Sequence, residues 1–214
     1  MADRKQRILS EAQRLLDEQG VEGFTIRELS RRAGVAQRTL YNVFGSKEDI
    51  VASAIEQHYA GLLEDLPPPT QVDDIELQLR RIAGISRVVI SLRRYATAMV
   101  GVFFSPAVDR RIYDSLRRIS VAGSGNWIDR AEAAKVLVKM SDADRERLTT
   151  LVVNVGYANV TDWSAGRIPD AELGPRSQIN FLLCIRYFMR PKYRAQADVA
   201  LARLMSAGAD KSED

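Results

Sequence analysis

The chain has 214 residues, of which 46% are hydrophobic and 28% charged, and its net charge is +3. This is an ordinary globular balance, and no apolar run approaches the ~18–20 residues that a membrane span needs. The charged, amphipathic start does not resemble a signal peptide. The single cysteine, Cys184, lies in an apolar segment and cannot form an internal disulfide. We therefore expect a cytoplasmic protein.

Helical periodicity begins close to the N-terminus. The first predicted helix has an apolar stripe made of Ile8, Ala12, Leu15 and Leu16. Gly20 is placed to end this helix. Thr25 and Glu28 then have the spacing of a capping box, in which each side chain bonds a backbone amide of the other residue. A second helix is therefore expected to start after Thr25.

Two further short helices follow. Gly34 suits a tight turn, and a third helix is predicted from about Gln37 to Phe44, with Leu40 and Phe44 facing inward. Ser46 is placed to cap a fourth helix. Two short helices joined by a glycine turn predict a helix-turn-helix, whose second helix can enter the major groove of DNA.

The rest of the chain also has a helical pattern. The proline-rich stretch PPPTQVDD at 67–74 marks a boundary, because three prolines cannot continue a helix. Beyond it we expect helices over roughly 73–103, 106–122, 127–140, 142–165, 171–190 and 192–206. No convincing alternation of strands is present, so the fold class is predicted to be all-α.

The outward face of the third helix carries side chains suited to contact with DNA. This face holds Gln37, Arg38, Thr39, Tyr41 and Asn42. Arg bonds guanine edges, Gln and Asn bond adenine, and a Thr methyl can touch a thymine methyl. Tyr41 and Lys47 have the reach and donors for phosphates, as does Thr25 at a helix N-terminus. Residues 25–47 hold five Lys or Arg against one Glu, a local net charge of +4. A solvated helix face would also carry such residues, so the spacing alone leaves both readings open.

The run GVEGFTIRELSRRAGVAQRTLYNVFGSKEDIV resembles the N-terminal DNA-binding domain of TetR-like transcriptional regulators, over about residues 5–52. The matching features are T-x-x-E, L-x-x-x-A-G-V, T-L-Y, a following Phe, and S-K-E-D-I. The resemblance implies a homodimer on a near-palindromic operator in double-stranded DNA. It also implies release when a small-molecule effector enters a C-terminal domain.

Residue roles follow from the same resemblance. Thr25, Tyr41 and Lys47 would contact phosphates, Thr39 either phosphate or base, and the base-edge candidates are Arg27, Gln37, Arg38 and Asn42. The sequence departs from the family pattern at Ala36, where a capping Ser is common. It departs again at Val43, where an aromatic residue or His is common. The implied organisation is a helix-turn-helix domain at 1–50, a connecting helix at 51–66, an effector-binding and dimerisation domain at 67–206, and a flexible tail at 207–214.

Two C-terminal helices, 142–165 and 171–190, are candidates for the dimer interface. The second is apolar nearly all round, so both of its sides must be covered. The residues proposed for this interface are Leu148, Val152, Val155, Asn159, Trp163, Ile179, Leu182 and Met189. The alternative is that these helices form the core of a monomer.

A second set of residues is a candidate lining for an effector cavity. Three polar residues on the opposite face of 142–165, namely Asn154, Tyr157 and Thr161, are expected to point inward. The expected apolar walls are Tyr95, Met99, Phe103, Tyr113 and Trp127. Ordinary core packing is the alternative for the whole set. Residues 80–118 also hold nine arginines against two aspartates, which fits solvated surface, pairs between domains, or an acidic effector.

Other function classes find little support in the sequence. The only histidine, His58, lacks a nearby nucleophile, and no glycine-rich phosphate loop or metal-ligand spacing is present. We therefore expect no enzyme activity, no catalytic residues, no cofactor and no metal. The expected function is a ligand-responsive DNA-binding repressor. The alternative is a helical adaptor that has lost specific DNA binding.

Overall fold

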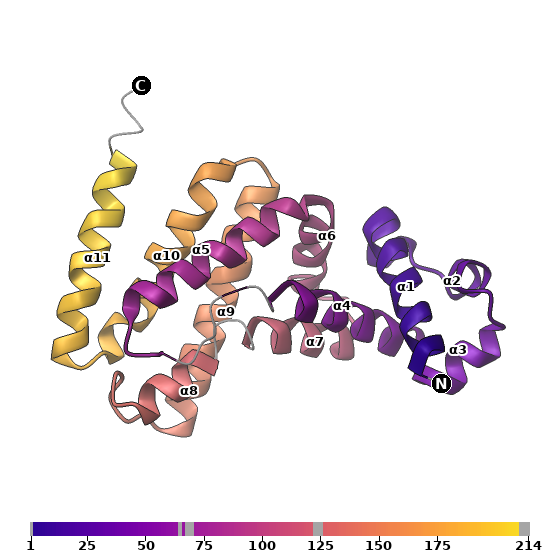
Figure 1. The fold of residues 1–214 in the computed structure, drawn as a ribbon, viewed down its shortest axis with the longest axis horizontal. Coiled ribbons are helices and arrows are strands. Elements are labelled where there is room, and N and C mark those ends of the chain that lie inside the picture. The colour runs from indigo at the N-terminus through magenta and orange to yellow at the C-terminus, as the bar shows by residue number, and fades with distance from the viewer. Residues whose placement is uncertain (1, 64–65, 67–70, 122–125, 210–214) are drawn as a thin grey trace. The chain divides into compact units, whose positions relative to one another are not determined.

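The computed structural model describes residues 2–63, 66, 71–121 and 126–209 (Figure 1). In these ranges the chain is helical apart from loops and one isolated antiparallel bridge between Leu137 and Met189. The predicted all-α fold class is therefore confirmed. The three prolines and the last five residues, 210–214, lie outside the described residues. No helix in the described ranges is long and apolar enough to cross a membrane.

The helices group into two compact units, residues 1–64 with 92–119 and residues 65–91 with 120–214. The first unit contains α1 (Ala2–Gly23), α2 (Ile26–Ala33), α3 (Gln37–Phe44), α4 (Lys47–Leu63), α6 (Arg93–Phe103) and α7 (Arg110–Ser120). The second contains α5 (Ile75–Ser91), α8 (Asn126–Ala133), α9 (Asp142–Ser164), α10 (Asp170–Ile185), the 3-10 helix η2 (Arg186–Phe188) and α11 (Pro191–Ala209).

In the first unit, α1 packs against α2, α4 and α6. The predicted apolar stripe of α1 is fully covered, since Ile8, Ala12, Leu15 and Leu16 are all 0% exposed. Burial of each large aliphatic side chain contributes about 1.5–3 kcal/mol. Gly20 interrupts α1 with φ 67 and ψ −176, so the helix breaks at the expected place but resumes as far as Gly23.

The second unit is built around α10, which packs against α5, α9 and α11. The largest buried side chains of this unit are Trp127 and Trp163. The ring of Trp127 lies 5.3 Å from that of Phe181 in an edge-to-face arrangement. The aliphatic core around them includes Leu79, Leu148, Leu182, Ile185 and Met189. This unit has a hydrophobic core of its own, separate from the helices of α1–α4.

Two predicted helices have different bounds in the structure. The segment 73–103 is divided into α5 and α6 at Leu92, a break that no proline or glycine announces. The helix predicted over 106–122 begins only at Arg110, because Asp109 Oδ1 accepts the backbone N–H of Arg111 and so caps this end. These corrections move helix ends and leave the fold class unchanged.

The helix predicted over 127–140 is also shorter than expected, because α8 ends at Ala133. The chain beyond it pairs with a distant segment. Val138 N–H donates to Phe188 O at 2.8 Å, and Arg190 N–H donates to Val136 O at 3.0 Å. These bonds satisfy the backbone outside a helix.

The two compact units of the structure have different bounds from the domains expected from the sequence. Residues 92–119, which form α6 and α7, group with the N-terminal helices rather than with 120–214. The functional division into 1–50, 51–66, 67–206 and 207–214 stays a prediction. The grouping adds that α6 and α7 pack on the predicted DNA-binding helices.

Candidate nucleic-acid interface

The turn between α2 and α3 is fixed by hydrogen bonds on both sides. Thr25 caps α2, and its hydroxyl accepts the N–H of Glu28 at 3.3 Å. Gly34 adopts the left-handed conformation, with φ 61 and ψ 38, which costs a side-chain-bearing residue free energy. Ser30 then spans the turn, because its hydroxyl donates to Val35 O at 2.6 Å and its carbonyl accepts Val35 N–H at 3.2 Å. These contacts set the orientation of α3.

The two faces of α3 differ in exposure as the sequence predicts. Leu40 is 0% exposed and anchors the helix. The candidate contact residues Gln37, Arg38, Tyr41 and Asn42 are exposed, and Thr39 is partly buried. Ala36 precedes the helix without a side-chain cap. The first turn of α3 therefore keeps free backbone N–H groups beside an exposed polar face.

Phe44 at the end of α3 is only partly buried, although the sequence analysis places it inside. The Nζ atom of Lys5 lies 5.6 Å from the centre of its ring, in a cation–π contact. This contact places Lys5, from the first turns of α1, next to the end of α3. The sequence analysis did not select Lys5. The clustering of Arg4, Lys5 and Arg7 was the signal that could have found it.

The arginines of the helix-turn-helix fall into two groups. Arg31 donates to Glu28 at 2.6 Å, and Arg32 donates to Glu28 at 2.8 Å and to Glu18 at 2.6 Å. The hydrogen bonds from Arg31 and then Arg32 lower the pKa of Glu28 from 4.5 to about 2. Part of the local charge of +4 is therefore already offset by carboxylates.

The remaining cations of this region are available to a ligand. Arg27 and Arg38 are exposed and Lys47 is partly exposed. None of the three forms an ion pair with a residue in the described ranges. Arg27 and Lys47 stand in the first turns of α2 and α4, and Arg38 in the first turn of α3. Three helix N-terminal turns therefore each present an unpaired cation.

The capping box at the start of α2 is only half formed. The Thr25 hydroxyl takes the N–H of Glu28 as expected. The Glu28 carboxylate does not reach back to the Thr25 amide, because it accepts hydrogen bonds from Arg31 and Arg32 instead. Charge-assisted bonds to two guanidinium groups are stronger than one bond to an exposed amide.

Ion pairs connect α7 to the helix that follows the recognition helix. Ser46 caps α4, because its hydroxyl accepts the N–H of Asp49 at 3.1 Å. Arg111 of α7 donates to the same Ser46 hydroxyl at 2.9 Å and lies 3.3 Å from the Asp49 carboxylate. Further along, Arg118 bonds the carboxylate of Glu56 in α4. Of the nine arginines in residues 80–118, at least Arg111 and Arg118 are therefore engaged in ion pairs, which was one of the alternatives for this group.

The candidate effector residues of the first unit form an aromatic core. Tyr95, Met99 and Phe103 of α6 are at most 4% exposed. Tyr113 of α7 stacks on Phe103 with ring centres 5.1 Å apart. His58 of α4 lies 4.7 Å from Tyr95, and burial lowers the pKa of this histidine. These residues therefore join α4, α6 and α7.

The candidate effector residues of the second unit have different surroundings. The Thr161 hydroxyl donates to the Tyr157 carbonyl at 2.9 Å, so its own helix satisfies it. Trp127 is 1% exposed, and its indole N–H has no hydrogen-bond acceptor among the described residues. Asn154 is exposed, and its predicted inward orientation is wrong.

Most candidates for the dimer interface are core residues of a single chain. Six of them are buried, at 7% exposure or less: Leu148, Val152, Asn159, Trp163, Leu182 and Met189. These six side chains pack within a single chain, and their assignment to the dimer interface stays a prediction. Val155 and Ile179 are partly exposed. The larger exposed apolar side chains of this region are Leu151 at 47%, Leu183 at 51% and Tyr187 at 80%.

Comparisons with known proteins bear on the same N-terminal region. The family model of bacterial regulatory proteins of the tetR family matches residues 8–54. Residues 8–54 are therefore similar to the helix-turn-helix domain of this family of transcriptional regulators, which agrees with the resemblance found in the sequence. The matched residues include the turn at Gly34 and the whole of α3.

Curated relatives match over a similar part of the chain. Uncharacterised HTH-type transcriptional regulators of Mycobacterium tuberculosis and Mycobacterium bovis are 33% identical over 85 residues, 40% of this chain. The alignment spans 44% of the length of these relatives.

Solved TetR-family structures share the fold over most of the chain. A regulator from Streptomyces coelicolor has a TM-score of 0.65 at 16% identity, covering 96% of this chain and 90% of that one. One from Rhodococcus sp. has a TM-score of 0.66 at 16% identity, covering 89% and 100%. Thermus thermophilus FadR, a repressor in complex with lauroyl-CoA, has a TM-score of 0.64 at 17% identity, covering 87% and 95%. At these identities the likeness supports the fold alone.

Proposed function

We propose that this protein is a homodimeric, cytoplasmic repressor that binds a near-palindromic DNA operator and is released by a small-molecule effector. The observation that carries the proposal is the exposed polar face of α3. Gln37, Arg38 and Asn42 are exposed on a helix that Leu40 anchors and that the turn at Gly34 orients. A helix presented in this way can enter the major groove and read base edges.

The proposed contacts divide into two classes. Arg27, Gln37, Arg38 and Asn42 are the base-edge readers. Contacts to phosphates fix the register without reading sequence. They are assigned to Thr25, Tyr41 and Lys47, and Thr39 serves either class. Thr25 already uses its hydroxyl as an acceptor within α2, and the hydroxyl proton is still available for a phosphate oxygen.

Dimerisation follows from the geometry of an operator. Two recognition helices read successive major grooves only when they lie ~34 Å apart, one turn of DNA. We place the interface on the exposed apolar side chains of α9, α10 and η2. Leu151 and Leu183 supply the aliphatic part, and Tyr187 the aromatic part. Val155 and Ile179 keep part of their surface exposed, and each lies four residues along its helix from Leu151 or Leu183, on the same face.

Effector release requires a path from the ligand to the recognition helix. Within the first unit, α7 bonds to α4 through Arg111 and Arg118. The aromatic residues Tyr95 and His58 also pack α6 against α4. An effector that moves α6 or α7 would therefore shift α4, and with it the start of the helix after α3. The differential affinity of the effector for the two arrangements sets the extent of release.

We assign the effector contacts to the remaining candidates for the cavity lining. In the first unit they are Tyr95, Met99, Phe103 and Tyr113, and in the second Trp127, Tyr157 and Thr161. Trp127 carries the strongest support. Its buried indole N–H lacks an acceptor among the described residues, and an unpaired buried donor costs free energy that a bound acceptor would recover.

The test is binding of the purified protein to the DNA upstream of its own gene. Fluorescence anisotropy with this duplex and with a shuffled duplex should show sequence preference and a steep loss of affinity with salt. Arg147→Ala is the matched control for removal of a positive charge outside the predicted DNA-contact residues. Arg147 is an exposed arginine of α9 that pairs with Asp144. Equal, weak binding to both duplexes would favour the adaptor alternative.

A further inference from the structure

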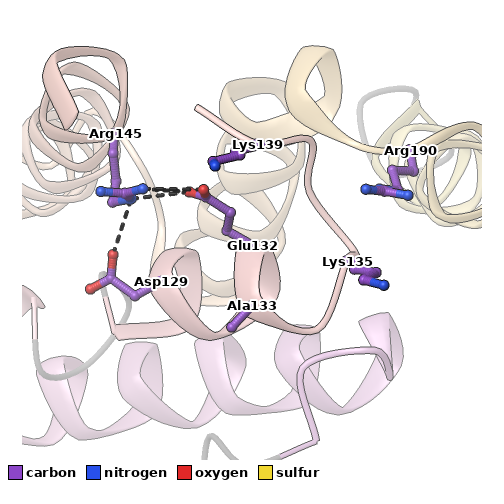
Figure 2. A pocket seen from close by; sticks show the side chains of 7 residues that line it. All are labelled: Asp129, Glu132, Ala133, Lys135, Lys139, Arg145 and Arg190. Carbon is purple, nitrogen blue, oxygen red and sulfur yellow. Dashed lines mark hydrogen bonds and ion pairs between the residues drawn. The ribbon is translucent and has the colours of Figure 1, made fainter. Parts of the chain in front are cut away.

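A charged hollow of about 420 Å³ lies in the second unit (Figure 2). It is formed by α8, the loop after it, the first turn of α9 and the residue before α11. The residues that line it are Asp129, Glu132, Ala133, Lys135, Lys139, Arg145 and Arg190. All of these residues except Ala133 carry a charge, whereas pockets for drug-like ligands are lined mostly by hydrophobic and aromatic side chains.

One arginine of the hollow, Arg145, is shared among several carboxylates. Arg145 lies 2.9 Å from the Glu132 carboxylate and 3.6 Å from that of Asp129, as the dashed lines in Figure 2 show. Arg145 also pairs with Asp142 at 2.7 Å. One of the four cations that line the hollow is therefore already engaged by carboxylates.

Three cations of the hollow have no such partner. Lys135, Lys139 and Arg190 are exposed and form no ion pair or hydrogen bond through their side chains with a residue of the described ranges. With four cations and two carboxylates, the lining has a net charge of +2. In the view of Figure 2, Arg145 stands on the left and Lys135 and Arg190 on the right. Cations therefore stand at opposite sides of one hollow.

Backbone bonds hold these cations in place. Arg190 N–H donates to Val136 O at 3.0 Å, and Val138 N–H donates to Phe188 O at 2.8 Å. The segments that carry Lys135, Lys139 and Arg190 are thus tied together. Lys135 has φ 59, and it is the sole non-glycine residue with positive φ in the part of the chain that the structure describes. Such backbone strain is concentrated at functional sites.

We propose that this hollow binds a small phosphate-bearing anion. A phosphate monoester carries about −1.5 to −2 charges near neutral pH, which matches the net charge of the lining. The guanidinium of Arg190 can donate two parallel hydrogen bonds to phosphate, and the two lysines act as point charges. The proposal rests on contacts within the second unit and does not depend on DNA binding.

The experiment is a titration of the full chain with inorganic phosphate and, separately, with adenosine monophosphate, followed by calorimetry and by backbone amide chemical shifts. Sodium chloride at matched ionic strength controls for screening. Saturable shifts are expected at residues 135–139 and 190. Tighter binding of the nucleotide would indicate an ester as the ligand, and equal binding would indicate free phosphate. Both outcomes support the site.

Variants identify the residues that bind. Lys139→Gln and Arg190→Gln should each weaken phosphate binding about tenfold, the effect of one charge-assisted hydrogen bond. Lys135→Asn serves as a third variant, because Asn tolerates the left-handed backbone. The matched control is Lys192→Gln, an exposed lysine over the Tyr193 ring that does not line the hollow.

Two results would overturn the proposal. One is the absence of any saturable shift at residues 135–139 and 190 with either phosphate compound. The other is binding that Lys139→Gln, Arg190→Gln and Lys192→Gln weaken equally, because a diffuse surface charge and not a site would then be responsible. Melting temperatures of all variants, compared with the parent, verify that each one is folded.

Discussion

Two arginines on neighbouring helices illustrate how ion pairing decides the availability of a side chain. Arg31 on α2 is held by two hydrogen bonds to the Glu28 carboxylate. Arg38 on α3 is exposed and has no ion pair within the described ranges. An arginine that is already paired must break that pair before it bonds a base, so its net gain on binding is small. Arg38 does not carry this cost.

Substitutions at Arg38 and Lys47 should therefore weaken operator binding in different ways. Arg38→Ala should cost about 1–3 kcal/mol and relax preference at one base pair. Lys47→Ala should weaken all sequences alike and reduce the slope of log affinity against log salt by about 1. Anisotropy titrations against operators substituted at each base pair, at several salt concentrations, measure both effects.

Arg31→Ala is the control for this pair of variants. It removes the same positive charge as Arg38→Ala, from an arginine that Glu28 already holds. A smaller and sequence-independent loss is expected. If Arg31→Ala relaxes base preference as much as Arg38→Ala does, the assignment of base reading to α3 is wrong.

At the scale of elements, a network of charges joins the helices that precede α3. Glu28 accepts hydrogen bonds from Arg31 and Arg32 within α2, and Arg32 also bonds Glu18 of α1. These groups lie at the surface, so salt screens their interaction. The pKa of Glu28 nevertheless falls from 4.5 to about 2. The stability of the helix-turn-helix domain is therefore expected to depend on pH through this network.

Glu28→Gln should remove part of the pH dependence of stability between about pH 4.5 and 2. In this window the unfolded chain binds a proton at Glu28 that the folded chain does not, so stability rises with pH. The contribution of Glu28 is complete above pH 4.5 and is lost as pH falls toward 2. Urea unfolding over this range, at low and high salt, measures the difference between parent and variant.

Glu22→Gln provides the comparison. Glu22 is an exposed carboxylate of α1 without an ion pair in the described ranges. Its replacement removes a carboxylate that lacks the arginine partners of Glu28, so a change seen only with Glu28→Gln is caused by those pairs. A Glu28→Gln variant whose slope also equals that of the parent would show that the arginine pairs exert no net effect in solution.

The elements that the sequence predicted well are those with local signals. The hydroxyls of Thr25 and Ser46 each accept the backbone N–H of the residue three positions later in the chain. Gly34 adopts a left-handed backbone conformation. All of these features lie within short stretches of sequence. These signals fixed the bounds of α2, α3 and α4, and Leu40 fixed the face of α3. The Glu28 half of the capping box failed, because Arg32 offered a stronger partner that itself bridges to a distant Glu18.

Predictions failed where long-range contacts decide the structure. The end of α8 depends on backbone bonds from 136–138 to 188–190, which no local pattern announces. Helix α9 is apolar on more than one side, with Leu148 buried and Leu151 exposed. The sequence could not show which side faces the core, so Asn154 was predicted to point inward although it is exposed. Phe44 was predicted to face inward, but it is only partly buried, and Lys5 from α1 lies over its ring.

At the scale of the whole molecule, the proposed function depends on a dimer. A single helix-turn-helix reads one half-site, and affinity for a near-palindromic operator comes from two linked half-sites. The buried core of each chain already uses Trp163, Leu182 and Met189. We therefore expect a partner to contact the apolar surface that remains exposed.

Leu183→Asp should dissociate the dimer while leaving each chain folded. Leu183 is 51% exposed in the single chain, so a charge there meets water in the monomer but would be desolvated in the interface. A cost of roughly 3 kcal/mol, about a hundredfold in the dimer dissociation constant, is expected. Size-exclusion chromatography with light scattering over a range of concentrations measures it, and operator affinity should fall in parallel. Val199→Asp, which changes a 73% exposed residue of α11, should leave the dimer intact. If Val199→Asp dissociates the dimer and Leu183→Asp does not, the interface lies on α11 and the proposed surface on α9 and α10 is wrong.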